Sequence, residues 1–143
     1  MLRFENDEAT LELTVASYEL SDTYQADSDE KNWLSIRAMY REDDLLIKDS
    51  NSCLLTYELK DLAVGLKVLA AGIKDRYDSD FSEPFFLLQA WKEGDGFLMD
   101  VSFALPNTMA EVDVAELRIA MTLAEMKSFI SQIEKDIERF PER

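Results

Sequence analysis

The sequence predicts an α+β fold: a twisted, mainly antiparallel sheet of about six or seven strands, with two amphipathic helices packed on one face. Three observations support this prediction. Apolar and polar residues alternate over much of the chain, as in strands with one buried face. Two other stretches repeat apolar residues at helical spacing. A capping box marks the start of the second helix.

The length of 143 residues favours one domain, residues 1–143, which can bury about 70% of its unfolded surface around a single core. A core of this size needs no disulfide or structural metal, and we expect no cofactor. The chain has one cysteine, and it has neither an apolar signal segment nor an apolar run long enough to span a membrane. These features predict a cytoplasmic protein that does not contact membranes.

The net charge of the chain indicates which kinds of molecule it can bind. Acidic residues outnumber basic ones by 30 to 15, which gives a net charge of −15. Nine carboxylates and one base lie in the first 30 residues. Such a surface repels nucleic acid and anionic membranes, and it speeds the encounter with a basic protein. The same acidity can instead serve only solubility.

Residues 1–31 predict two paired strands and a loop. Leu11, Leu13 and Val15 alternate with less apolar neighbours, which indicates a half-buried strand. We expect residues 1–5 to pair with this strand. The polar segment 21–31 is predicted to be a loop.

Residues 32–51 predict a hairpin. Apolar residues at every second position from Leu34 to Tyr40 indicate a strand. The acidic residues 42–44 indicate a turn. The return strand is predicted to be short, residues 45–48, because residues 49–51 have the composition of a loop.

Residues 52–73 predict the transition from a strand into the first helix. Thr56 is the expected N-cap, and Glu58 lies near the positive end of the helix dipole. The apolar face is predicted to extend over about five turns. It consists of Leu59, Leu62, Ala63, Leu66, Leu69, Ala70 and Ile73.

The second half of the chain predicts three strands and a helix. A polar, exposed segment at residues 74–80 precedes a strand at 85–92. Gly94 and Gly96 indicate a hairpin turn, and the return strand places Phe97, Met99, Val101, Phe103 and Leu105 on one face. A last strand is predicted at 112–121.

Thr122 and Glu125 form the capping box of the final helix, in which each side chain accepts a hydrogen bond from a backbone N–H of the first turn. Pro141 ends this helix. Its apolar stripe consists of Met126, Phe129, Ile130, Ile133 and Ile137. Both halves of the chain therefore contain strands, a threonine cap and a helix in that order, which hints at an internal repeat.

The sequence argues against an enzyme. Without histidine, no Ser-His-Asp or Cys-His pair and no histidine-containing metal site can form. Cys53 lies among apolar residues and is expected to be a buried thiol. A calcium loop starting at Asp78 would place Glu83 where glycine is needed and Gln89 where the bidentate glutamate is needed. We therefore predict no catalytic and no metal-binding residues, and we expect Trp33 and Trp91 to lie in the core.

Four segments together resemble the WapI-type immunity protein family. They are Asn32-Trp33-Leu34, Cys53-Leu54-Leu55-Thr56 with Glu58-Leu59, Phe81-Ser82-Glu83-Pro84, and Phe140-Pro141-Glu142-Arg143. Their order and spacing carry the resemblance, which extends from about Leu11 to the end of the chain. The chain has Glu83-Pro84-Phe85-Phe86 where the family usually has Glu-Pro-Asn-Leu.

The resemblance implies a small bacterial cytoplasmic protein that is not an enzyme and that neutralises a nuclease-type polymorphic toxin by direct binding. The acidic surface fits a basic toxin domain as the partner. The candidate contacts are Asp27, Asp29, Glu30, Glu42, Asp43, Asp44, Asp75, Asp78 and Asp80. Two alternatives remain open: an acidic accessory or regulatory domain without a toxin partner, and an α+β domain that binds a small ligand.

Overall fold

A computed structural model describes residues 1–21, 27–109 and 112–143. In this part of the chain two antiparallel sheets of four strands accompany three helices. Sheet A consists of β1 (Leu2–Glu5), β2 (Ala9–Tyr18), β3 (Trp33–Glu42) and β4 (Leu45–Leu55). Sheet B consists of β5 (Arg76–Asp78), β6 (Phe86–Glu93), β7 (Gly96–Ala104) and β8 (Val114–Met121). The helices are α1 (Ser28–Asn32), α2 (Thr56–Ala70) and α3 (Leu123–Arg139).

The α+β class is confirmed, but the prediction of one sheet is wrong. Each sheet follows the chain order, β1-β2-β3-β4 and β5-β6-β7-β8, and each is followed by a long helix. Alternation of apolar residues identifies strands but not their partners. It therefore does not reveal that β4 and β5, which α2 connects, belong to different sheets. The repeated order of strands and helix agrees with the hint in the sequence.

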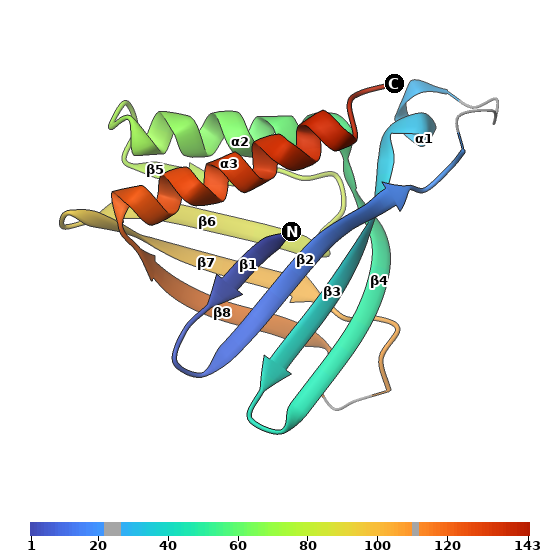
Figure 1. Ribbon diagram of the computed structural model, residues 1–143, viewed down its shortest axis with the longest axis horizontal. Helices are drawn as coiled ribbons and strands as arrows, with labels where there is room; N and C mark the ends of the chain where they lie inside the picture. The colour runs from blue at the N-terminus through green and yellow to red at the C-terminus, as the bar shows by residue number, and fades with distance from the viewer. Residues whose placement is uncertain (22–26, 110–111) are drawn as a thin grey trace.

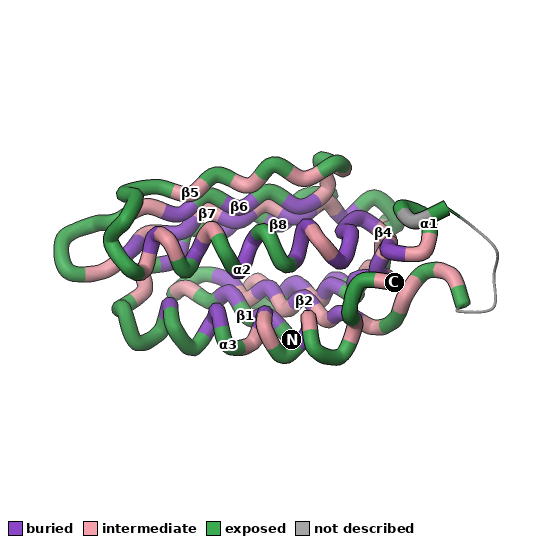
Figure 2. Tube along the Cα trace, turned by 90° about the horizontal axis from the view of Figure 1, so that it is seen from above, coloured by how far each residue is buried: buried purple, intermediate pink, exposed green. Residues whose placement is uncertain are grey.

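The sheets turn their apolar faces toward each other. The two long helices lie side by side across both sheets (Figure 1), and buried residues gather between the two rows of strands (Figure 2). The ring of Phe4 in β1 lies 6.5 Å from that of Phe86 in β6 and 5.3 Å from that of Phe129 in α3. These edge contacts join both sheets and α3 in one core.

Three loop predictions need correction. Residues 49–51 continue β4, pairing in register with residues 36–38 of β3. Residues 28–32 form α1 rather than a loop, whereas residues 22–26 lie outside the described part. Within the segment 74–80, Arg76–Asp78 forms the short edge strand β5. Composition missed the two strand segments because polar residues can also pair in a sheet when a neighbouring strand is available, here β3 for residues 49–51 and β6 for residues 76–78. It missed α1 because this helix has no apolar periodicity; Asp27 caps it by accepting from the Glu30 N–H.

The first long helix also differs from its prediction. It begins at Thr56, so Leu55 is the N-cap residue, and the Thr56 hydroxyl donates to the Asn32 side chain instead of capping the helix. Glu58 accepts from the Leu55 N–H, which is one half of a capping box. The helix ends at Ala70, and Ile73 is 74% exposed beyond Gly72, whose φ of +77° stops the helix.

Other predictions are confirmed. Residues 2–5 pair with β2, the β6–β7 hairpin turns through Gly94 at a φ of +58°, and β7 buries its predicted face. Gly96 has no positive φ; a Cβ there would lie 2.5 Å from the Met121 carbonyl oxygen, so a close approach of backbone requires glycine. Trp33 and Trp91 are half-buried on the outer sides of their sheets and do not belong to the core.

The apolar stripe of α2 makes a quantitative prediction. Leu66 is 0% exposed, so Leu66→Ala should lower the free energy of unfolding by about 2–5 kcal/mol. Val64 on the same helix is 53% exposed, and Val64→Ala is the matched control, expected to change stability by less than about 0.5 kcal/mol. Urea unfolding of the two variants measures the difference, and equal stabilities would contradict the assigned core face.

The cap of α3 can be tested by removing and restoring one oxygen. The Thr122 hydroxyl accepts from the Glu125 N–H at 3.1 Å, and the Glu125 carboxylate accepts from the Thr122 N–H at 3.0 Å. Thr122→Ala should therefore lower the stability to urea by about 1 kcal/mol, whereas Thr122→Ser retains the acceptor and most of the stability. If serine and alanine destabilised equally, the hydroxyl would not be the cap.

Candidate functional site

The nine predicted contact residues lie at three separate places. Asp27, Asp29 and Glu30 lie at α1, Glu42, Asp43 and Asp44 at the β3–β4 turn, and Asp75, Asp78 and Asp80 on or beside β5. The ten residues of β3 separate α1 from the turn by about 30 Å, and Figure 1 shows them at opposite ends of sheet A. The β5 residues belong to the other sheet. The structure therefore does not bring the nine residues together in one site.

The acidic residues at α1 help to hold this short helix in place. Asp27 accepts a hydrogen bond from the Glu30 N–H at 2.9 Å and caps the helix. Asp29 accepts one from the Tyr57 hydroxyl, which links α1 to α2. This bond is the main reason that the pKa of Tyr57 is raised to about 12. All three carboxylates remain exposed to a partner.

The β3–β4 turn presents its acidic residues more freely. Asp43 and Asp44 are exposed at the tip, and Asp43 has a φ of +50°, which aspartate tolerates better than most residues. Glu42 is half-buried and accepts a hydrogen bond from the Tyr40 hydroxyl at 2.9 Å. Burial and the contact with Glu42 together raise the pKa of Tyr40 to about 12. The tip therefore offers two exposed carboxylates at the end of a hairpin.

The acidic residues around β5 include one that is already paired. Arg76 donates to both oxygens of Asp78, at 3.1 and 2.9 Å, and both side chains are exposed. Asp75 and Asp80 flank the strand and are also exposed. Because an exposed ion pair contributes little, a partner could separate Arg76 from Asp78 at small cost.

Asn32 forms a buried junction that the composition did not reveal. Its side-chain oxygen accepts from the Thr56 hydroxyl and from the Arg143 N–H, each at 2.8 Å. Its side-chain nitrogen donates to the Arg143 carbonyl at 3.0 Å. Asn32 is 1% exposed, so these bonds replace the water that it loses on folding. The end of α1, the start of α2 and the C-terminal residue meet here.

The side chain of Arg143 strengthens this junction. Its guanidinium group donates to the carbonyls of Leu20 and Lys31, at 2.8 and 2.9 Å. The same group lies over the Tyr18 ring, 3.9 Å from its centre, in a cation–π contact. Tyr18 in turn contacts the ring of Phe140 and donates its hydroxyl to the Pro141 carbonyl. The C-terminal segment 140–143 is thus held against sheet A through Tyr18 of β2.

Glu58 connects the start of α2 to the loop before β6. It is 6% exposed, and its two oxygens accept from the N–H groups of Leu55 at 3.0 Å and Ser82 at 2.6 Å. Two backbone donors and the helix N-terminus stabilise the buried carboxylate. The contacts of Glu58 therefore indicate a structural role and not that of a general acid or base.

The other residues that could take part in catalysis or metal binding are either unreactive or too far apart to form a site. Burial raises the pKa of Cys53 to about 12, so the thiol stays protonated at neutral pH and is no nucleophile. In residues 1–21, 27–109 and 112–143, no group of three potential ligands is placed to hold a metal ion. Over the same ranges, no helix has the length and apolarity to cross a membrane.

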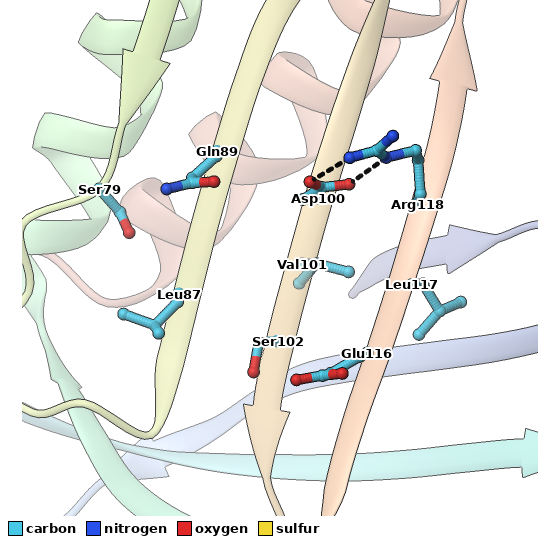
Figure 3. Close-up of a pocket in the computed structure, with 9 residues that line it drawn as sticks. All are labelled: Ser79, Leu87, Gln89, Asp100, Val101, Ser102, Glu116, Leu117 and Arg118. Atoms are coloured by element: carbon cyan, nitrogen blue, oxygen red, sulfur yellow. Dashed lines mark hydrogen bonds and ion pairs between the residues drawn. The ribbon is translucent and has the colours of Figure 1, made fainter.

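The outer face of sheet B carries a shallow hollow of about 450 Å³ (Figure 3). Side chains from β6, β7 and β8 line most of it, including Leu87, Gln89 and Glu116. Arg118 donates to both oxygens of Asp100, at 2.8 and 3.0 Å, and lowers the pKa of that carboxyl.

Trp91 lies beside this hollow, and the guanidinium groups of Arg76 and Arg118 lie 5.3 and 5.2 Å from its ring centre. Tryptophan and arginine dominate the binding energy of many protein interfaces. The sequence contained a signal for this face, because burying Phe86, Leu88 and Ala90 turns the residues between and after them outward. The same alternation places Trp91 on the outer face and not in the core.

Comparison with known protein families gives a match over almost the whole chain. A model described as the immunity protein WapI-like family matches residues 1–141 of this chain. No curated protein and no solved structure matches it.

The four segments that carry the resemblance meet in space. Asn32 contacts Thr56 and Arg143, and Glu58 contacts Ser82, so each segment contributes a residue to one hydrogen-bonded group. The contact between Asn32 and Arg143 consists of two hydrogen bonds and joins residues 111 positions apart in the chain. The segments therefore explain how the fold is held together rather than which surface binds a partner.

Replacing Asn32 tests this interpretation. Asn32→Ala leaves the Thr56 hydroxyl and both backbone groups of Arg143 without their partner, and it should lower the free energy of unfolding by about 2–4 kcal/mol. Thr56→Val removes only one of these hydrogen bonds and should cost about 1 kcal/mol. Urea unfolding compares the two, and an Asn32→Ala variant no less stable than Thr56→Val would contradict the central role of the amide.

Proposed function

The chain belongs to the WapI-like immunity protein family, and from this premise we propose that it neutralises a polymorphic toxin by binding it directly. The family match over residues 1–141 is the observation that carries the proposal. Under this proposal the chain is a single cytoplasmic domain, it is not an enzyme, and it needs neither cofactor nor metal. Its task is to occupy a surface of the toxin.

The charge of the chain supports a basic partner, and we infer a nuclease-type toxin domain. A nuclease that binds a polyanionic substrate needs a basic surface. A protein with a net charge of −15 attracts such a surface from a distance. Steering of this kind raises association rates by about 10- to 1,000-fold at low salt. An acidic inhibitor can therefore compete with the polyanionic substrate for this basic surface.

Each of the three acidic groups is a separate candidate for the surface that contacts the toxin. A typical interface covers about 800 Å² on each partner, which as a round patch is about 32 Å across. The distance of about 30 Å between α1 and the β3–β4 turn is close to this width, so one interface reaches both groups only at its opposite edges. A toxin domain centred on one of these groups therefore does not cover the other. The turn is the most accessible, because Asp43 and Asp44 project from the tip of a hairpin.

A neutralisation assay tests the function itself. The chain is used to capture proteins from a lysate of its own organism at low and at high salt, and captured toxin domains are produced separately. Co-expression of the chain with its toxin should restore growth, and the purified chain should inhibit the nuclease activity in solution. A toxin that remains active in the presence of excess chain would contradict the proposal for that toxin.

The contribution of the turn can be measured with a pair of variants of equal charge. Asp43→Asn/Asp44→Asn should slow association with the toxin domain several-fold at low salt and reduce the salt dependence of the rate. Glu93→Gln/Asp95→Asn makes the same charge change at the exposed β6–β7 turn, outside the three acidic groups. Stopped-flow fluorescence measures both rates. If the two variants slowed association equally, only the net charge would matter.

A further inference from the structure

The outer face of sheet A reverses the charge of the rest of the molecule. The inward residues of β1 to β4 are apolar, so the alternation turns the polar residues of these strands outward. Four of the 15 basic residues of the chain lie on this outer face, and all four are exposed. They are Arg3, Arg37, Arg41 and Lys48.

Most of this positive charge is not neutralised within the protein. Arg3 pairs with Glu5 at 2.7 Å and with Glu12 at 3.0 Å, so it takes up both neighbouring carboxylates. Of the ion pairs within 4.0 Å in the described part of the chain, none involves Arg37, Arg41 or Lys48. Three cations thus remain without a carboxylate, although acidic residues outnumber basic ones two to one.

The strand register places these cations around Met39. Met39 lies opposite Lys48 on β4 and opposite Glu12 on β2. Arg37 and Arg41 point to the same side two residues before and after it, about 13 Å apart. Two shallow hollows of about 670 and 250 Å³ share the half-buried Met39 as part of their floor. Glu12 lines both hollows as well, but it is paired with Arg3. The face therefore places the apolar side chain of Met39 among three cations.

We propose that this outer face of sheet A, the basic face, is a docking surface for a short acidic segment of a partner protein. The proposal goes beyond toxin neutralisation, because it concerns a different surface from the three acidic groups and holds whether or not the partner is a toxin. Asp and Glu side chains would pair with Arg37, Arg41 and Lys48. The planar guanidinium groups can hold a carboxylate through two parallel hydrogen bonds.

The size and charge of the basic face favour this occupant over others. A distance of about 13 Å accommodates about four residues of an extended segment. A longer polyanion such as nucleic acid would extend beyond the face onto acidic surface, where it would be repelled. A symmetric contact with a second copy would place the basic faces of both copies opposite each other. A short acidic segment avoids both penalties.

Titration of the intact protein with a synthetic peptide tests the proposal. The probe has roughly ten residues with a central run of about four glutamates, matching the length of the face. Calorimetry measures its affinity, and NMR follows the Met39 methyl signal, which should shift on binding. Arg37→Gln/Lys48→Gln should weaken binding about 5- to 20-fold through the loss of two charge pairs. Arg41→Gln should weaken it less, as a second and independent variant.

The control is Lys127→Gln/Lys135→Gln, which removes two exposed lysines of α3 and gives the same net charge. It should change the affinity less than about twofold, because these lysines lie on another element. An absence of peptide binding, or an equal loss in both double variants, would overturn the proposal. If a single-stranded oligonucleotide of equal charge bound more tightly through the same residues, the ligand of the basic face would be a nucleic acid and not an acidic peptide segment. If the protein self-associated and Arg37→Gln/Lys48→Gln abolished this, the partner at the basic face would be a second copy of the chain.

Discussion

The structure depends on one buried amide. Asn32 accepts hydrogen bonds from Thr56 and Arg143 and donates one to Arg143, and each of these groups left unpaired would cost about 1–3 kcal/mol. The same amide holds Arg143, while the capping box at Thr122 anchors the other end of α3 directly after β8. This helix is therefore attached to sheet B at its start and to sheet A through the segment that follows it. The two attachments keep α3 lying across the core, where Phe129 meets Phe4.

Two sheets that share one core leave two outer faces in contact with solvent. Because β-strands alternate between faces, the apolar residues that build the core also fix which residues point outward. On sheet B these include Trp91 with two arginines, and on sheet A they include the cations around Met39. The surfaces available for binding are thus a direct consequence of the packing of the core. Charge on a sheet face is also held more rigidly than charge on a loop, so less side-chain and backbone freedom is lost when a partner binds.

Local patterns in the sequence predicted most elements but not their arrangement. The Thr122 capping box, the β6–β7 hairpin and the buried face of β7 depend on neighbouring residues, so they could be predicted. The division into two sheets, the continuation of β4 through Asp49 and the role of Thr56 depend on contacts outside the local segment, such as the pairing with residues 36–38 and the bond to Asn32. For the same reason, the acidic residues could be selected by composition, but their separation into three places could not be seen. The basic face was hidden because its cations are spread over three strands.

The uneven distribution of charge has a consequence for how a partner would approach. A uniformly acidic protein attracts a basic partner equally from all sides and leaves its orientation undetermined. Here, the three acidic groups lie at α1, at the β3–β4 turn and at β5, while Arg37, Arg41 and Lys48 on the outer face of sheet A oppose the approach of a basic surface. At physiological salt, charges act over about 8 Å, so the face nearest to the partner determines the final approach. Under the proposed function, a basic toxin domain would then be directed away from the outer face of sheet A and toward the acidic groups. An acidic segment is directed to the face around Met39, so the two kinds of partner would not compete for the same surface.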